Sequence, residues 1–199
     1  LQYELAKKIG FGLASTITTN NKNKLLCFAE KYDPVVIKML HQGFYLDIDG
    51  KNKGMYVNKL SVADLADFGG ADENPITLQA YIEKSYEVRY TVVGDDHHVC
   101  KIDSQRSLRS SVDWRRYDLA NTPHSLIEPP SDVKRMVTSL MAELDLTYGA
   151  LDFIVSVDGE WIFLEVNSMG QWLWIENLTG SRISRSISTW LACNSEEVR

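Results

Sequence analysis

The sequence has few cysteines, no long apolar run and no excess of basic charge, and each shortage excludes a class of protein. Its three cysteines are scattered and form no Cys-x-x-Cys or Cys/His spacing, which disfavours a disulfide scaffold or a zinc site. No apolar run approaches the roughly 18 residues of a membrane span, and no signal peptide opens the chain. With 21 Lys and Arg against 27 Asp and Glu, the net charge of −6 disfavours broad nucleic-acid binding. We therefore expect a reduced, cytoplasmic protein with neither nucleic acid nor membrane as a partner.

The composition is that of a globular protein that can bury a substantial core. Hydrophobic residues make up 44% of the 199 residues and charged residues 24%. Apolar periodicity predicts helices over 1–9, 21–32, 61–67, 131–144 and 181–192, and strands over 13–19, 35–39, 54–60, 77–82, 86–94, 98–104, 148–157 and 161–167. Ser131, which follows two prolines, is the expected N-cap of the long helix.

One internal boundary is predicted near residue 75. The segment 67–75 (DFGGADENP) is turn-forming throughout, and helices mixed with strands lie on both sides of it. An α+β fold of two lobes, 1–75 and 76–199, is therefore expected. Leu1 is not a methionine and falls inside a helix-like segment, so we also expect an N-terminal portion to precede it.

The strongest local signal is a hairpin that carries two carboxylates. Asp158-Gly159 between two apolar runs predicts a two-residue type I′ turn, and its register places Asp152 opposite Glu165. Alternation then divides the side chains between two faces. The core face would hold Leu151, Phe153, Val155, Ile162, Leu164 and Val166, and the other face Asp152, Glu165, Asn167, Ile154 and Phe163.

Two like charges directly opposite each other destabilise a strand pair unless a cation lies between them. Two carboxylates and an amide oxygen are ligands that Mg²⁺ accepts, and this ion usually keeps substrate phosphates among its other ligands. The pair therefore indicates a nucleotide site. The alternative interpretation is a solvated polar face, although Ile154 and Phe163 beside the carboxylates fit that interpretation poorly.

Several motifs together resemble one enzyme family. The hairpin D-F-I-V…F-L-E-V-N (152–167) resembles the metal-binding end of ATP-grasp carboxylate ligases. The run G-Q-W-L-W-I-E-N-L-T-G (170–180), the segments Q-A-Y-I-E-K (79–84) and Y-E-V-R-Y-T-V-V-G (86–94), and D-W-R (113–115) resemble the ATP-grasp maturases of ribosomal peptides, the microviridin-type or graspetide ligases. The resemblance covers about residues 35–192. It implies an ATP-grasp fold with two α+β lobes that grip ATP, of which 1–75 would be the small lid lobe.

The resemblance also implies roles for individual residues. Asp152, Glu165 and Asn167 would bind one or two Mg²⁺ ions held by ATP, and Arg89 and Arg115 would hold the transferred phosphate or the acyl phosphate. Nucleotide contacts would come from Lys38 at the phosphates, from the hinge segment with Gln79, Tyr81 and Ile82 at adenine, and from Glu87 at the ribose.

Other interpretations of these residues stay open. Lys38 could be a surface charge, and Glu87 and Arg89 could form an ion pair on an exposed strand. Four arginines lie within residues 106–116 and suit bidentate binding of phosphate or carboxylate, or a solvated face. Trp172 and Trp174 are expected to pack rather than to bind. The chain departs from many relatives in the single glycine of segment 39–44, in Ser168 where a proline is frequent, and in lacking an N-terminal substrate-binding domain of about 100 residues, which would precede Leu1.

The predicted activity is that of an ATP- and Mg²⁺-dependent ligase. It would activate a side-chain carboxylate of a precursor peptide as an acyl phosphate and close an intramolecular ester or amide. The resemblance makes that peptide the partner and allows a homodimer. The alternatives are a glutamate or glutathione-type carboxylate–amine ligase and a non-catalytic ATP-grasp remnant that binds peptide or nucleotide.

Overall fold

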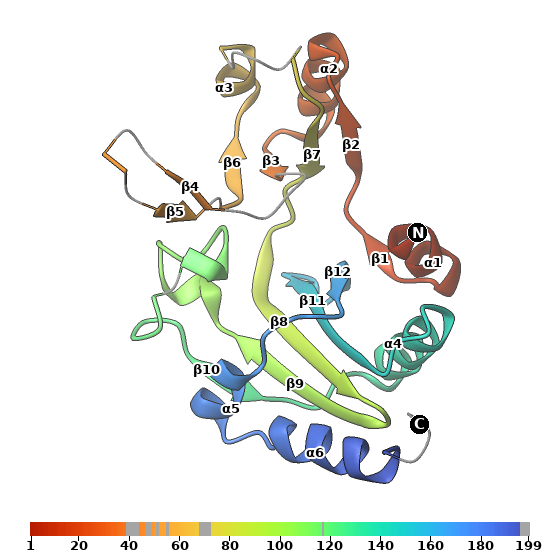
Figure 1. Cartoon of the computed structure of the whole chain (residues 1–199). Helices are drawn as coiled ribbons and strands as arrows, with labels where there is room; N and C mark the ends of the chain where they lie inside the picture. Colours follow the sequence, from red (N-terminus) through yellow and green to blue (C-terminus); the bar gives the residue numbers. More distant parts are fainter. Residues whose placement is uncertain are drawn as a thin grey trace. The chain divides into compact units, whose positions relative to one another are not determined.

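The computed structural model describes residues 1–38, 44–46, 49–50, 52–54, 56–67, 73–116 and 118–195 (Figure 1). The chain divides into a large unit of Leu1–Leu13, Glu83–Arg106 and Leu119–Arg199, and a small unit of Ala14–Ile82 and Ser107–Asp118. These units differ from the predicted lobes 1–75 and 76–199, because the first 13 residues pack with the C-terminal half and residues 107–118 return to the N-terminal half. Most of the predicted glycine-poor segment 39–44 lies outside the described residues.

The large unit is built on a six-stranded sheet in the order β1-β12-β11-β8-β9-β10 (Figure 1). Its strands are β1 (Gly12–Leu13), β8 (Lys84–Val93), β9 (Asp96–Ile102), β10 (His124–Leu126), β11 (Tyr148–Ser156) and β12 (Trp161–Asn167). Its helices are α1 (Gln2–Ile9), α4 (Ser131–Glu143), α5 (Leu173–Thr179), α6 (Ile183–Cys193) and the 3₁₀ turn η1 (Ser104–Arg106). Helices α1 and α4 cover one face, and α5 and α6 lie on the other (Figure 1).

The main core lies between this sheet and α1 and α4. Its buried side chains are Ala6, Phe11, Val88, Tyr90, Val92, Val99, Val133, Val137, Leu140, Met141, Leu151, Phe153, Val155 and Phe163. The apolar stripe of α4 is thus confirmed, but Ser131 is not its N-cap. The carbonyl of Pro130 accepts the first helical hydrogen bond, from the Lys134 amide at 3.0 Å, so Ser131 is already the first helical residue.

The small unit holds a four-stranded sheet in the order β2-β7-β3-β6. Its strands are β2 (Thr16–Thr19), β3 (Val35–Lys38), β6 (Asn58–Leu60) and β7 (Ile76–Ala80). The strands β4 (Phe44–Leu46) and β5 (Asn52–Gly54) form a separate two-stranded sheet in this unit. It also contains α2 (Lys22–Tyr32), α3 (Val62–Ala66) and the 3₁₀ turn η2 (Trp114–Arg116). Its core consists of Leu25, Ala29, Val35, Leu65 and Leu78. Ser61 caps α3 as expected, in a capping box with Asp64.

The turn of the β11–β12 hairpin is not the predicted type I′. The Ser156 amide donates to the Glu160 carbonyl at 2.9 Å, so three residues, 157–159, form the loop, and Gly159 adopts a left-handed φ of 84°. A three-residue loop that ends on a left-handed glycine is the next common hairpin connection. Near the turn the register is therefore shifted by one, with Ile154 opposite Ile162.

A bulge at Leu164 restores the predicted register beyond this shift. Phe153 pairs with Phe163 and Asp152 with Glu165, so Leu164 is the extra residue. The neighbouring backbone groups bond to α1: the Leu164 carbonyl accepts from the Tyr3 hydroxyl at 2.5 Å, and the Val166 amide donates to the Gln2 side chain at 2.8 Å. On the turn side of the bulge the predicted faces are wrong: Phe163 lies in the core, and Ile162 lies opposite Ile154.

The helix α6 is joined to the sheet by a half-buried histidine. The two ring nitrogens of His98, on β9, lie 2.9 Å from the Ser181 hydroxyl and 3.0 Å from the Ser186 hydroxyl. Burial lowers the pKa of His98, against the opposing effects of Asp96 and Glu176. The folded protein therefore binds a proton at this ring less readily than the unfolded chain does.

We expect the stability to fall as the pH drops below about 6.5, the ordinary His value, because the unfolded state then takes up more protons than the folded state. Thermal unfolding of the wild type and of His98→Asn at about pH 7.5 and 5.5 measures this, and the variant should lose less stability on acidification. His97 and His124, whose pKa values burial also lowers, supply the remaining slope in both proteins. Equal pH slopes in the two proteins would contradict the assignment to His98.

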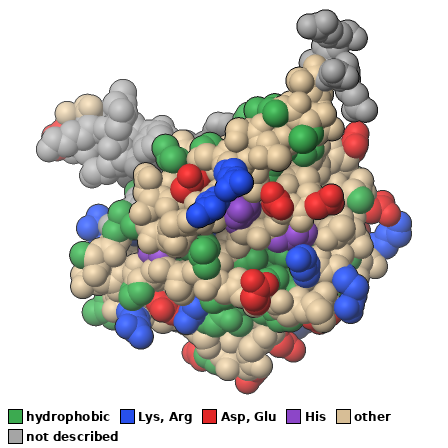
Figure 2. Space-filling model, turned by 90° about the horizontal axis from the view of Figure 1, so that it is seen from below, with side chains coloured by type: hydrophobic (Ala, Val, Ile, Leu, Met, Phe, Trp, Pro, Cys, Tyr) green, Lys and Arg blue, Asp and Glu red, His purple; other side chains and the backbone are tan. Residues whose placement is uncertain are grey.

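Charges of both signs are interspersed on the face shown in Figure 2, in keeping with the modest net charge. No helix in the part of the chain that the structure describes combines the length and apolar character needed to cross a membrane.

Candidate active site

A row of charged side chains crosses three strands of the large unit. Arg89 on β8 lies directly opposite Asp152 on β11, which lies directly opposite Glu165 on β12. The predicted juxtaposition of the two carboxylates is confirmed. These side chains stand on the sheet face away from the main core. Three adjacent strands of a rigid sheet position them.

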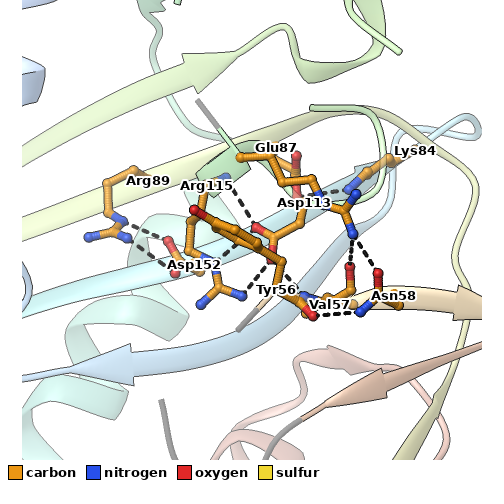
Figure 3. Close-up of polar contacts among 10 residues, drawn as sticks. Tyr56, Val57, Asn58, Lys84, Glu87, Arg89, Asp113, Arg115 and Asp152 are labelled. Carbon is orange, nitrogen blue, oxygen red and sulfur yellow. Dashed lines mark hydrogen bonds and ion pairs between the residues drawn. The ribbon is translucent and has the colours of Figure 1, made fainter. Parts of the chain in front are cut away.

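Arg89 is held by more than one partner, of which Figure 3 shows Asp152. Its Nε donates to Asp152 Oδ1 at 2.6 Å and its Nη2 to Oδ2 at 3.3 Å, while Nη1 donates to the Gln171 carbonyl at 3.4 Å. The ring of Trp174 lies 5.9 Å from the guanidinium carbon. The arginine and aspartate side chains are only 10% and 13% exposed, so their attraction is weakly screened.

The thiol opposite Arg89 on β9 does not compete for the guanidinium. Burial raises the pKa of Cys100 to about 12, so this group stays neutral at pH 7. Asp152 therefore supplies the negative charge next to Arg89 on these neighbouring strands.

The chain folds back over the sheet directly after β12. The Asn167 side-chain oxygen accepts from the Met169 amide at 2.9 Å, and the Gly170 amide donates to the Asn167 carbonyl at 3.2 Å. The Tyr148 hydroxyl donates to the Gly170 carbonyl. We call residues 168–172 the return loop. A Cβ at Gly170 would lie 2.4 Å from that of Ala150, so only glycine permits this close approach.

We expect Gly170→Ala to destabilise the large unit by about 1–3 kcal/mol, because the added methyl group cannot fit against the strand. Thermal and denaturant unfolding measure the change. In the double variant Ala150→Gly/Gly170→Ala, removal of the opposing methyl should recover part of the loss. Wild-type stability of Gly170→Ala would show that the return loop moves away from the sheet at little cost.

Glu87, the predicted ribose contact, forms a buried ion pair (Figure 3). Lys84 Nζ lies 2.8 Å from Glu87 Oε1, and the two side chains are only 2% and 7% exposed. The alternative of an exposed strand with Glu87 paired to Arg89 is thus wrong in both respects, since Arg89 pairs with Asp152. Lys84 orients the carboxylate predicted to meet the ribose.

The other predicted nucleotide contacts lie on the small unit. Lys38 ends β3 opposite Thr77 of β7, and Gln79 is buried with its side-chain amide donating to the Thr16 hydroxyl at 3.0 Å. The Tyr81 amide donates to the Pro34 carbonyl at 3.2 Å, and Ile82 follows it, half-buried. The hinge is thereby fixed to the start of β3.

Arg115 is tied to its neighbour in the D-W-R motif. Its Nε and Nη2 each donate to a different oxygen of Asp113 at 2.9 Å, and that carboxylate also accepts from the Val57 amide at 3.0 Å. Although burial opposes the effect, the bonds and charge of Arg115 hold the pKa of Asp113 below its usual range. Arg116 donates to the Val57 carbonyl, so half of the predicted arginine cluster is engaged within the small unit.

The donor set in the large unit fits a hard divalent cation. Among the described residues no group of three or more His, Cys, Asp and Glu side chains could hold a metal ion. Asp152 and Glu165 nevertheless form an adjacent pair, and Asn167, two residues further on, carries an amide oxygen. Two carboxylates and one amide supply part of an oxygen ligand shell, which suits Mg²⁺ because it keeps water and phosphate ligands.

Lys84, the Gln171 carbonyl and the contact of Trp174 with Arg89 are not predicted by the sequence motifs. Lys84 had a local signal, because it lies three residues from Glu87. The other two had none, because strand β8 and the return loop meet only through the fold.

This chain is similar to solved structures of ATP-grasp ligases. A RiPP-associated ATP-grasp ligase of Chryseobacterium gregarium, in complex with ADP and a leader and core peptide, is 35% identical with a TM-score of 0.89, and the match covers 97% of this chain and 58% of that one. Macrocyclase MdnC of Microcystis aeruginosa MRC, bound with precursor peptide MdnA, is 27% identical with a TM-score of 0.83, covering 96% of this chain and 58% of that one.

The ATP-grasp ligase PsnB, complexed with a phosphomimetic variant of a minimal precursor, Mg and ADP, shares the fold with a TM-score of 0.75 at 18% identity; the match covers 98% of this chain and 57% of that one. No protein-family model and no curated protein matches the chain. The expected α+β ATP-grasp fold and the resemblance to ligases of ribosomal peptides are thereby confirmed. The chain spans a little over half the length of each of these relatives.

Proposed function

Because this chain is an ATP-grasp protein that resembles the ligases of ribosomal peptides over almost all of its length, we propose that it is an ATP- and Mg²⁺-dependent peptide macrocyclase. Its substrate is a ribosomally made precursor peptide. The observation that supports this best is the row Arg89–Asp152–Glu165, which sets a fixed cation beside two carboxylates on a rigid sheet.

In this proposal Asp152, Glu165 and Asn167 would hold Mg²⁺. The bound ion would neutralise part of the charge on the ATP phosphates. The neighbouring strands keep the two carboxylates side by side, so that the ligand pair is formed before the metal binds. This preorganisation offsets part of the entropy cost of assembling the site.

The remaining residues bind the nucleotide and the transferred group. Lys38 contacts the phosphates, the segment of Gln79, Tyr81 and Ile82 binds adenine, and Glu87, oriented by Lys84, accepts hydrogen bonds from the ribose. Because the Tyr81 amide already donates to Pro34, adenine recognition falls to the carbonyl of Tyr81 and to Ile82. In this proposal the lid is the small unit of Ala14–Ile82 and Ser107–Asp118 rather than 1–75, because residues 1–13 pack with the large unit.

The proposed reaction has two steps. A carboxylate oxygen of the peptide attacks the γ-phosphorus, and the bond to ADP breaks, which leaves an acyl phosphate. A hydroxyl or amine of the same peptide then attacks the acyl carbon; phosphate leaves, and the nucleophile loses its proton. Arg89 and Arg115 stabilise the negative charge that moves from ATP to the acyl phosphate.

Mass spectrometry of a cognate precursor peptide tests the proposal. Incubation with the full-length protein, ATP and Mg²⁺ should remove one water, about 18 Da, for each ring closed. Omitting ATP is the control. Addition of free glutamate without dehydration of any peptide would instead identify a carboxylate–amine ligase, and nucleotide binding without turnover would identify a non-catalytic remnant.

A further inference from the structure

We infer that Trp174 is a positioning residue for Arg89. Its indole ring and the adjacent Gln171 carbonyl retain the guanidinium at the site when Asp152 turns to another partner. This inference rests on the proposed function, because that function gives Asp152 a metal to bind and Arg89 a phosphate.

Among the described contacts of the Arg89 guanidinium are one charged group, Asp152, and two uncharged groups on another segment. Asp152 accepts two hydrogen bonds at 2.6 and 3.3 Å, the Gln171 carbonyl accepts one at 3.4 Å, and the Trp174 ring lies 5.9 Å away. Asp152 belongs to a sheet strand, whereas the other two partners lie on the return loop and at the start of α5.

Trp174 and the carbonyl form one assembly. The indole Nε1 donates to the same Gln171 carbonyl at 3.2 Å, so this oxygen receives bonds from both the indole and the guanidinium. Behind the indole, the His124 ring packs edge-on with its centroid 5.6 Å away. The Gly170–Ala150 contact holds the preceding loop against the sheet. The indole is therefore restrained by its hydrogen bond to Gln171 and by the packing of His124.

The need for such a residue follows from the chemistry of Asp152. A divalent cation bound at Asp152 would compete with Arg89 for the negative charge of the carboxylate and would repel the guanidinium, so metal binding weakens the ion pair. A guanidinium left without a fixed partner would sample several rotamers, and its orientation toward phosphate would be lost. A cation–π contact and a neutral carbonyl restrain the group without neutralising its charge.

Chemical labelling tests the inference without relying on activity. The rate at which phenylglyoxal modifies Arg89 is measured by peptide mapping, with MgCl₂ alone as the probe. With saturating Mg²⁺, Trp174→Leu should expose the guanidinium and raise the rate several-fold, whereas Trp174→Phe, which keeps a ring, should stay nearer the wild type. Leu173→Ala, an exposed neighbour on α5, is the matched control and should label as the wild type does. Equal labelling of wild type and Trp174→Leu would overturn the inference.

Kinetics supply the second readout. Trp174→Leu should lower kcat about tenfold and leave Mg²⁺-ADP affinity within about twofold, since only the orientation of Arg89 has changed. Added to Arg89→Ala, the same substitution should lower kcat little further. Additive losses would show that Trp174 acts independently of Arg89 and would overturn the inference. An inactive wild type that still shows the labelling difference would refute the proposed function alone.

Discussion

Replacing Glu165 by Gln is expected to remove most of the Mg²⁺-dependent binding of ATP and to lower turnover at least tenfold, since one of two carboxylate ligands loses its charge. The fold should be unaffected, because Glu165 is half-buried and its neighbour Asp152 already pairs with Arg89. The metal-free protein should gain a few tenths of a kcal/mol from the relieved repulsion. Thermal unfolding with and without Mg²⁺-ATP measures both effects.

Asp152→Asn should give the same loss of binding but a different stability. It removes the carboxylate from a pair with Arg89 whose side chains are 10% and 13% exposed, and this should cost the metal-free protein about 1–3 kcal/mol. Glu160→Gln, an exposed position on the same hairpin, is the matched control and should change neither quantity. Equal shifts with Mg²⁺-ATP in wild type, Glu165→Gln and Asp152→Asn would refute the metal assignment.

Lys84→Met should destabilise the large unit by about 3 kcal/mol. The ion pair with Glu87 is almost fully buried, and removing one member of such a pair leaves the other charge in a poorly solvated place. Adding Glu87→Gln should recover much of the loss, because the amide is neutral. Chemical denaturation of the single and double variants measures the coupling.

A second lysine offers a matched control for this experiment. Lys101 pairs with Asp103 at the same distance of 2.8 Å, but its side chain is 29% exposed. Lys101→Met should therefore cost less than about 1 kcal/mol. Similar costs for the two lysines would show that burial does not determine the strength of the Lys84 pair.

The carboxylate pair could be predicted from the sequence, although the predicted loop type and the regular strand were wrong. The turn residues Asp158-Gly159 correctly located the hairpin, and its apolar alternation correctly identified two faces. The loop type was wrong, because a left-handed glycine suits both two- and three-residue loops. The bulge at Leu164 has no signature in the hairpin itself, and its neighbouring backbone groups bond to Gln2 and Tyr3, more than 160 residues away. The one-residue shift at the turn and the one-residue bulge offset each other, so Asp152 still stands opposite Glu165.

Partners joined by the fold could not be predicted. Arg89 and Asp152 are 63 residues apart, and the hydrophobic pattern of β8 and β11 does not specify which residues of the two strands stand opposite each other. The same holds for Trp174, whose spacing indicates packing on a short helix. Of the arginines near residue 115, Arg115 bonds locally to Asp113, whereas the bond of Arg116 to the Val57 carbonyl arises from the fold.

The bulge at Leu164 acts as a phase shift within one strand. On the turn side, odd-numbered residues of β12 such as Phe163 enter the core; beyond the bulge, even-numbered Val166 packs there and Glu165 stays on the opposite face. A regular strand of this sequence would have to bury either Phe163 together with the charge of Glu165, or neither. Core packing and ligand placement on β12 can therefore vary independently. A regular strand that kept Leu164 would direct Glu165 into the apolar interior, whereas deletion of Leu164 would leave Phe163 and Glu165 on opposite faces.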